Sequence, residues 1–256
     1  MLTAYTNASL YGRNSIAGAL ASFGDRARSV VPLLLADCER EIKPHNDNGW
    51  RIQLAIAAKT IAPDNAATLF PLFKDLDNSA GFVRQQTISA LARLGTNGME
   101  AVPALLKCLS HSDNQTRIDA TRALNRIGVD SDEYINALGK NLSYPNEFMV
   151  QEAEETLVTL ASHSELAYVA LVKSGKATFL LGQAMRTNTP ALLKGLDSSD
   201  PQVRLGTLEI FNEFRTPIAR PHIVPEAIPK LKELSTNDPD LKVREWAADI
   251  LYWLGG

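Results

Sequence analysis

Three arginine side chains are the groups of this 256-residue sequence best suited to hold an anion: Arg93, Arg122 and Arg126. A guanidinium is planar and always charged, and it can donate two parallel hydrogen bonds to a carboxylate or a phosphate. Together the three can clamp such a group on a partner. The alternative is that they pair with Asp119 and with Glu152 or Glu155 on the neighbouring helix.

Acidic and aromatic side chains extend this candidate binding surface toward the C-terminus. Its acidic members are Glu152, Glu155, Glu209 and Glu213. Its last members are Trp246, Asp249 and Trp253. Tryptophan offers rigid, amphipathic area suited to anchoring a protein interface. The same tryptophans can instead finish the last layer of the fold, so both interpretations stay open.

The sequence lacks the spacings typical of catalytic and metal sites. No H-E-x-x-H, C-x-x-C or nucleophile-elbow pattern occurs, and the four histidines are scattered: His45, His111, His163 and His222. The stretch 173–176, Lys-Ser-Gly-Lys, lacks the glycine spacing of a phosphate-binding loop and is interpreted as a turn. We therefore expect a protein that is not an enzyme and that carries neither a metal nor a cofactor.

A second set of arginines repeats along the chain and indicates what positions the candidate surface. Arginines at positions 51, 84 and 117 recur every 33 residues. The whole arginine column reads Arg13, Arg51, Arg84, Arg117, then Val150 in place of an arginine, then Arg204 and Arg244. Self-similarity at a fixed period is typical of stacked repeats. A catalytic pair would not be copied once per repeat, so we expect this column to stack the repeats.

The residues after each column position have the period of a helix. Small or apolar residues follow at three, six, seven and ten positions, which is one face of an α-helix. Positions two, five and nine then form an exposed stripe, which holds all the candidate binding residues and also Gly206. Upstream, a first apolar helix is expected to begin near a proline in five copies: Pro32, Pro71, Pro103, Pro190 and Pro229. Each repeat is therefore predicted to be a helical hairpin.

An aspartate stands four residues before the column arginine in four copies: Asp47, Asp113, Asp200 and Asp240. At that place a carboxylate can accept hydrogen bonds from the free N–H groups that begin the second helix. We expect it also to meet the arginine of its own or the adjacent repeat.

These residues carry a resemblance to a known family. The Pro-x-Leu of the first helix, the aspartate at the turn and the Val-Arg-x-x-Ala-x-x-Ala-Leu-x-x-Ile-Gly of the second resemble HEAT repeats, especially the short bacterial type of phycobilin lyases. The resemblance implies an all-α fold, a right-handed α-solenoid of about six to seven HEAT-like helical hairpins whose second helices line the concave side. We expect one continuous domain over residues 1–256.

Charge and composition narrow the class of partner. Residues 1–128 hold 14 Lys+Arg against 11 Asp+Glu, a net +3, whereas the remainder holds 12 against 18, a net −6. Such an asymmetry can orient a partner, and the acidic half argues against nucleic acid. No apolar run reaches the roughly 18 residues of a membrane span. Cys38 and Cys108 are expected to be buried rather than bridged, which favours a cytoplasmic location.

The leading hypothesis is a protein-binding scaffold, adaptor or chaperone that uses the concave face for a protein or peptide. The alternative is a chromophore chaperone like the phycobilin lyases, and a HEAT-like DNA glycosylase is less favoured because its groove should be basic. The segment 2–8 either caps the first helix or leaves an incomplete repeat through which a homodimer can form. Two departures from the repeat are candidates for function: the long turn at 43–50, and the stretch 163–189, which admits an additional helix.

Overall fold

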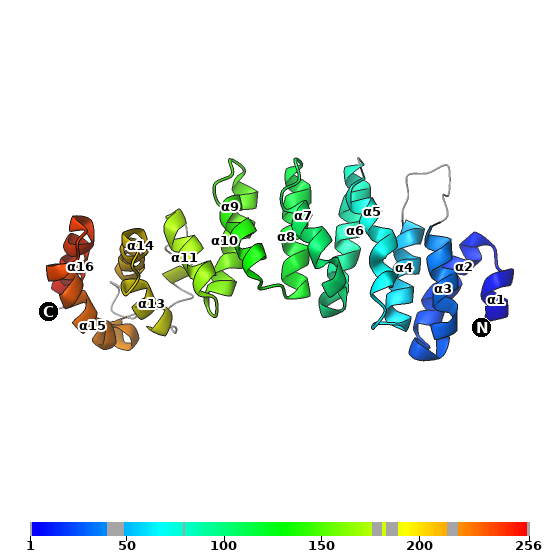
Figure 1. Ribbon diagram of the computed structural model, residues 1–256, viewed down its shortest axis with the longest axis horizontal. Helices are drawn as coiled ribbons and strands as arrows, with labels where there is room; N and C mark the ends of the chain where they lie inside the picture. The colour runs from blue at the N-terminus through cyan, green and yellow to red at the C-terminus, as the bar shows by residue number, and fades with distance from the viewer. Residues whose placement is uncertain are drawn as a thin grey trace. The chain divides into compact units, whose positions relative to one another are not determined.

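The protein is described here by a computed structural model, which covers residues 2–39, 49–78, 80–175, 181–182, 189–213 and 220–254. These described residues form helices and the joins between them, with no strand among them (Figure 1). The predicted all-α class is confirmed. The long turn at 43–50 falls largely outside the described residues, and so does Asp47.

The chain divides into two compact units, Met1–Val129 and Asp130–Gly256, called here unit 1 and unit 2. Each is described by itself, and the single continuous domain stays a prediction. Every column position lies on a helix, as the periodicity predicts. The helical hairpins of an α-solenoid are therefore present in both units, and the handedness stays a prediction.

Unit 1 is built from four second helices and the shorter helices that precede them. Each of these shorter first helices packs against the second helix that follows it. Three turns of 3-10 helix come before the first helices, η1 (Gly24–Val30), η2 (Ala66–Leu69) and η3 (Gly95–Ala101). The α-helices are α1 (Leu2–Asn7), α2 (Leu10–Ala21), α3 (Val31–Cys38), α4 (Gly49–Ile61), α5 (Phe70–Leu76), α6 (Gly81–Arg93), α7 (Val102–Cys108) and α8 (Asn114–Ile127).

Unit 2 has an additional helix. Its described helices are α9 (Asp132–Asn141), α10 (Glu147–Ala161), α11 (Glu165–Ser174), α13 (Thr189–Leu196), α14 (Pro201–Asn212), α15 (Arg220–Asn237) and α16 (Leu241–Leu254). Helix α11 packs against α9 and α10 on one side and α14 on the other. The extra helix expected between Val150 and Arg204 is thus present. It ends at Ser174, and Gly175 follows with a left-handed φ of 65°. Of the turn predicted at 173–176, residues 173 and 174 are still helical, and residue 176 lies outside the described residues.

Prolines begin most first helices but not the last. Pro32, Pro71 and Pro103 lie in the first turns of α3, α5 and α7, where a missing N–H removes no helical hydrogen bond. The prediction is wrong for Pro229, which lies inside α15 together with Pro225. A proline within a helix deletes a single N–H donor, and the packing of α15 against α16 supports the rest of the helix.

The buried face of the second helices is the predicted one. On α8, Ala120, Ala123, Leu124 and Ile127 are at most 1% exposed. The helix ends at Gly128, whose φ of 87° is left-handed, and its N–H donates to the carbonyls of Leu124 and Asn125. Glycine takes that conformation without strain, which explains why glycine closes the repeat.

Helix α1 covers the start of unit 1. The Tyr5 side chain is fully buried, and its hydroxyl donates to Asp37 Oδ2 at 2.8 Å. The Arg13 guanidinium lies 5.5 Å from the Tyr5 ring centroid and donates to both Asp37 oxygens at 3.0 Å. These contacts favour the capping alternative for segment 2–8, and a homodimer through this end stays a prediction.

Candidate functional site

The arginine column joins consecutive hairpins in unit 1. Arg13 pairs with Asp37 at 3.0 Å, and Arg51 pairs with Asp75 at 2.6 Å. Both aspartates lie at the C-terminal end of the first helix of the next hairpin and are almost fully buried. The column is therefore a structural seam, as expected, and its charges are satisfied within the fold.

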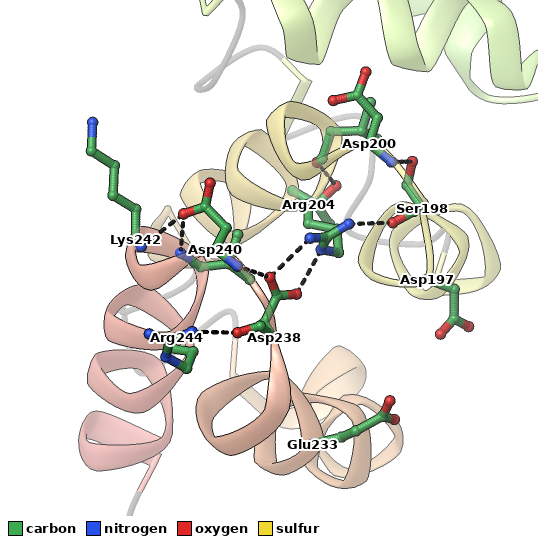
Figure 2. A network of polar contacts seen from close by, with 12 residues as sticks. Asp197, Ser198, Asp200, Arg204, Glu233, Asp238, Asp240, Lys242 and Arg244 are labelled. Atoms are coloured by element: carbon green, nitrogen blue, oxygen red, sulfur yellow. Dashed lines mark hydrogen bonds and ion pairs between the residues drawn. The ribbon is translucent and has the colours of Figure 1, made fainter.

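The same seam in unit 2 is a denser network, shown in Figure 2. Arg204 donates from Nε and Nη2 to the two oxygens of Asp238 at 2.7 and 2.8 Å, and from Nη1 to the Ser198 carbonyl at 2.7 Å. Arg244 donates to the Asp238 carbonyl, so one residue accepts from both arginines. The side chains of Arg204 and Asp238 are only 8% and 3% exposed. This buried two-pronged pair holds α14 against α15 and α16.

The aspartates four residues before the arginines cap helices but mostly do not pair with arginine. Asp113, Asp200 and Asp240 accept from backbone N–H groups at the starts of α8, α14 and α16, as predicted. Asp113 lies 3.4 Å from Arg84, whereas the ion pair found for Asp200 is with Lys173. The expected arginine pairing is thus wrong for Asp200. The arginines meet other carboxylates because the end of the next first helix lies nearer to them.

The three candidate arginines lie on neighbouring second helices of unit 1. Arg93 ends α6, while Arg122 and Arg126 lie on α8, and all three are exposed. Neither Arg93 nor Arg126 has an acidic partner within 4.0 Å among the described residues. Both arginines lie in the last turn of their helices, where a positive charge interacts favourably with the helix dipole. This is a modest structural role.

Two polar side chains at matching positions of α6 and α8 have an oxygen shut off from water. These are Gln86 and Asp119, whose Oε1 and Oδ2 are buried without a hydrogen-bond donor among the described residues. The other Asp119 oxygen accepts from Gln115 Nε2 at 2.9 Å. Desolvation raises the pKa of Asp119, although the Gln115 hydrogen bond and the charge of Arg122 oppose it. Both residues stand at position two of the predicted exposed stripe, so the burial of these oxygens differs from the prediction.

The acidic candidates lie on α10 and α14 of unit 2. Glu155 is exposed and accepts from Gln151 at 2.8 Å, while Glu152, Glu209 and Glu213 are half-buried. The expectation that Gly206 shares their exposed stripe is wrong, because Gly206 is buried. A Cβ at position 206 would clash with the Val172 side chain and lie 3.0 Å from its carbonyl oxygen. The extra helix α11 occupies that side of α14.

The aromatic candidates lie on the last helix, α16. Trp246 and Trp253 are half-buried, and Asp249 is exposed. The neighbouring Tyr252 is 83% exposed, and the apolar Leu251 and Leu254 are only half-buried. The helix therefore has one apolar part that packs on the fold and another that is exposed. Both interpretations of the tryptophans, as interface anchors or as the last layer of the fold, remain open.

A hollow of about 190 Å³ lies beside the additional helix and was not foreseen from the sequence. It is bordered by the α10–α11 turn, α11, α13 and the start of α14. Its floor is formed by Tyr168, whose hydroxyl lies 2.8 Å from Thr207 Oγ1. Gly195 permits this contact, because a Cβ there would lie 2.7 Å from the Tyr168 hydroxyl oxygen. At the rim, Lys194 and Glu165 form an exposed ion pair at 3.3 Å.

Residues that could support redox or metal chemistry are few in the described part of the chain. Burial raises the pKa of the Cys38 thiol to about 12 and that of Cys108 to about 11, so both stay protonated. Across the described ranges, no cluster of three or more His, Cys, Asp or Glu could hold a metal ion. Among the same residues, no helix is long and apolar enough to cross a membrane.

Comparisons with known proteins agree with the repeat pattern. Residues 66–158 match the family described as HEAT repeats. No curated protein matches the chain.

Engineered proteins are among the solved structures with similar chains. One engineered protein is 21% identical at a TM-score of 0.43, covering 99% of this chain and 77% of that one. A designed armadillo repeat protein in complex with the peptide (KR)4 is 18% identical at a TM-score of 0.37, covering 94% and 98%. Likeness at this level carries no information on function.

Proposed function

We propose that the chain is a HEAT-repeat protein, of which residues 66–158 match the family, and that it is a non-catalytic protein-binding scaffold, an adaptor or chaperone. The binding surface is the exposed stripe of the second helices. In unit 1 this stripe takes an acidic segment of a partner on α6 and α8. The two buried, unbridged cysteines are compatible with a cytoplasmic location for this role.

The observation that carries the proposal is the uneven pairing of basic side chains in unit 1. Arg13, Arg28, Arg51, Lys59 and Lys74 each have a carboxylate within 4.0 Å. Arg93 and Arg126 have none among the described residues, although they stand level on adjacent helices. Arg26 and Lys107 are also exposed and also have no carboxylate within 4.0 Å among the described residues, so the feature specific to α6 and α8 is that two such arginines lie level on adjacent helices. Exposed arginines on rigid helices suit carboxylate recognition.

The stripe of unit 2 completes the proposal with opposite chemistry. Its acidic side chains, and the aromatic ones at the end, would meet basic and apolar parts of the same partner: Glu152, Glu155, Glu209, Glu213, Trp246, Asp249 and Trp253. A scaffold with oppositely charged halves selects the direction in which a partner lies. Nucleic acid fits poorly, because three arginines supply few phosphate contacts.

No observation favours the chromophore-chaperone alternative. Such a role needs an open apolar cleft. The larger hollow in unit 2, about 490 Å³, is bordered by four charged side chains, Asp197, Arg204, Lys230 and Glu233, as well as by Pro201, Leu234 and Pro239.

Charge reversal of the exposed arginines tests the proposal. The probe is a fluorescein-labelled, N-acetylated and C-amidated hexaglutamate peptide, with hexalysine as the counter-probe, measured by fluorescence anisotropy. We expect Arg122→Glu with Arg126→Glu to weaken hexaglutamate binding about tenfold or more, since each reversal turns an attraction into a repulsion. The circular-dichroism melting curve should stay nearly unchanged, because both side chains are exposed.

A matched control separates this face from overall charge. Arg26→Glu with Lys107→Glu makes the same change in net charge at exposed positions of η1 and α7. It should leave most of the binding intact. If the wild-type protein does not bind hexaglutamate, or if both double variants lose it equally, the proposed function of this face is wrong.

A further inference from the structure

The hollow of about 190 Å³ beside α11 has a base that is held in place by hydrogen bonds. Thr207 Oγ1 donates to the Val203 carbonyl at 2.7 Å, which uses the single proton of that hydroxyl. The Tyr168 hydroxyl therefore donates to Thr207 Oγ1, at 2.8 Å, and keeps the Tyr168 ring at the base. The ring cannot move into the hollow without breaking this buried bond, so the hollow is preformed.

The walls that a ligand can touch are apolar. Val169 on α11 and Ala191 on α13 are half-buried, and Pro190 at the start of α13 is exposed. A cavity of about 150 Å³ is large enough to bind benzene, so this hollow accepts an apolar group of about one ring. Sites for drug-sized molecules begin at about 300 Å³. The hollow therefore suits a small ligand.

The mouth of the hollow carries one positive and one negative group. Lys194 Nζ lies 3.3 Å from Glu165 Oε2, and the two side chains are 69% and 68% exposed. An ion pair this exposed adds little to folding stability, so both groups can turn to a ligand at small cost. A free α-amino acid carries an ammonium group and a carboxylate on the same carbon atom as its side chain. Its charges are therefore complementary to the mouth when its side chain enters the hollow.

We infer that the hollow beside α11 binds a free α-amino acid whose apolar side chain is about the size of one ring. The side chain packs between Val169, Pro190 and Ala191. The carboxylate pairs with Lys194, and the ammonium group pairs with Glu165. A residue within a peptide lacks both of these charges, so the mouth distinguishes a free amino acid from a side chain of a bound protein. This site goes beyond the proposed function and does not depend on it.

Four probes with the same fluorinated ring test the inference on the wild-type protein by fluorine NMR titration. The first is para-fluoro-L-phenylalanine. The others lack one charge or both: the deaminated propionate, the decarboxylated ethylamine, and the N-acetylated amino acid amide. We expect the amino acid to bind about fivefold more tightly than either singly charged probe, because it makes one more ion pair. The neutral amide should bind most weakly.

Neutral variants of the mouth should affect different probes. Lys194→Gln should weaken the amino acid and the propionate about fivefold but not the ethylamine. Glu165→Gln should weaken the amino acid and the ethylamine but not the propionate. The matched control is Lys74→Gln, which removes the same charge from an exposed pair with Glu39 in unit 1. It should leave all four affinities unchanged.

Filling the hollow supplies an independent measurement. Ala191→Phe places a ring where the ligand ring would lie and should abolish binding of the amino acid. The circular-dichroism melting curve shows whether this variant is folded, and the variants of the mouth test the site if it is not.

The inference has clear contrary outcomes. No saturable binding of para-fluoro-L-phenylalanine at millimolar concentrations overturns it, and so does binding that neither Lys194→Gln nor Glu165→Gln changes. A neutral amide that binds as tightly as the amino acid also overturns it, since the hollow would then accept a side chain of a protein. The hexaglutamate result on unit 1 stands or falls separately.

Discussion

Units 1 and 2 are built from the same hairpin, yet they differ in how tightly their helices meet. In unit 1, glycines at the ends of second helices serve the turns, as Gly95 and Gly128 do with positive φ. In unit 2, Gly195 and Gly206 lie inside helices and allow neighbouring side chains to touch the backbone. The additional helix α11 is the cause, because both glycines face it. The additional helix α11 thus packs against the next hairpin at two positions where that hairpin has glycine instead of a larger residue.

One arginine–aspartate pair from each unit differs in burial, although Arg84 and Arg117 of unit 1 are as buried as Arg204. The Arg51 side chain is 23% exposed in its pair with Asp75, whereas Arg204 and Asp238 are 8% and 3% exposed. Water reaches the first pair and hardly reaches the second. In unit 1, Arg93, Arg122 and Arg126 are exposed, whereas in unit 2 Arg204 holds an irregular stack together through Asp238.

Removal of the Asp238 side chain should give the largest loss of folding stability. Asp238→Ala leaves the Arg204 guanidinium buried without its carboxylate, which typically costs about 3–5 kcal/mol. Asp75→Ala in unit 1 should cost less, because water can hydrate Arg51. Urea unfolding gives the free energies, and hydrogen exchange should quicken in α14 to α16 but not in α2 to α8. Equal losses for the two variants would show that burial does not separate the seams.

A methyl group at Gly206 should have the next largest effect. Gly206→Ala places a Cβ against the Val172 side chain and backbone, and overpacking of this kind costs about 1–3 kcal/mol. The control is Gly18→Ala on α2, where a Cβ would have no heavy atom within 4 Å. That change should stabilise by about 0.5–1 kcal/mol, because alanine favours a helix. Thermal melting measures whether each variant is more or less stable than wild type. A change in the same direction for both variants would contradict the predicted difference between Gly206 and Gly18.

The loss of folding stability at low pH should show the smallest difference between the two units. Burial alone would raise the pKa of Asp238, but its bonds with Arg204 and Asp240 lower it overall. The Thr116 hydroxyl lowers the pKa of Asp113 against an opposing desolvation. A lowered folded pKa gives stability above the unfolded value of about 3.9, lost as pH falls through the folded one. Below about pH 4, the free energy of unfolding measured in urea should fall less steeply for Asp238→Asn than for wild type as the pH decreases. The change should be smaller for Asp113→Asn. Identical slopes would exclude a role for these carboxylates.

Much of the fold could be predicted because its signals are local. The 3.6-residue period predicted the buried face of α8, and Asp113, Asp200 and Asp240 marked the starts of helices. The interval from Val150 to Arg204 left room for another helix. Each of these features depends on a few neighbouring residues. The sequence by itself therefore determined the repeat and its helices, but the exposed stripe only in part, because Gly206 is buried.

The tertiary structure alone decided which groups meet. It paired Arg204 with Asp238 rather than with Asp200, buried Gly206 against Val172, and shut one oxygen of Asp119 from water. Such contacts join residues some 30 or more positions apart, and the angle and spacing between packed helices set them. A period fixes the face on which a side chain lies, but only the packing of the neighbouring helix fixes whether that face is covered and by what.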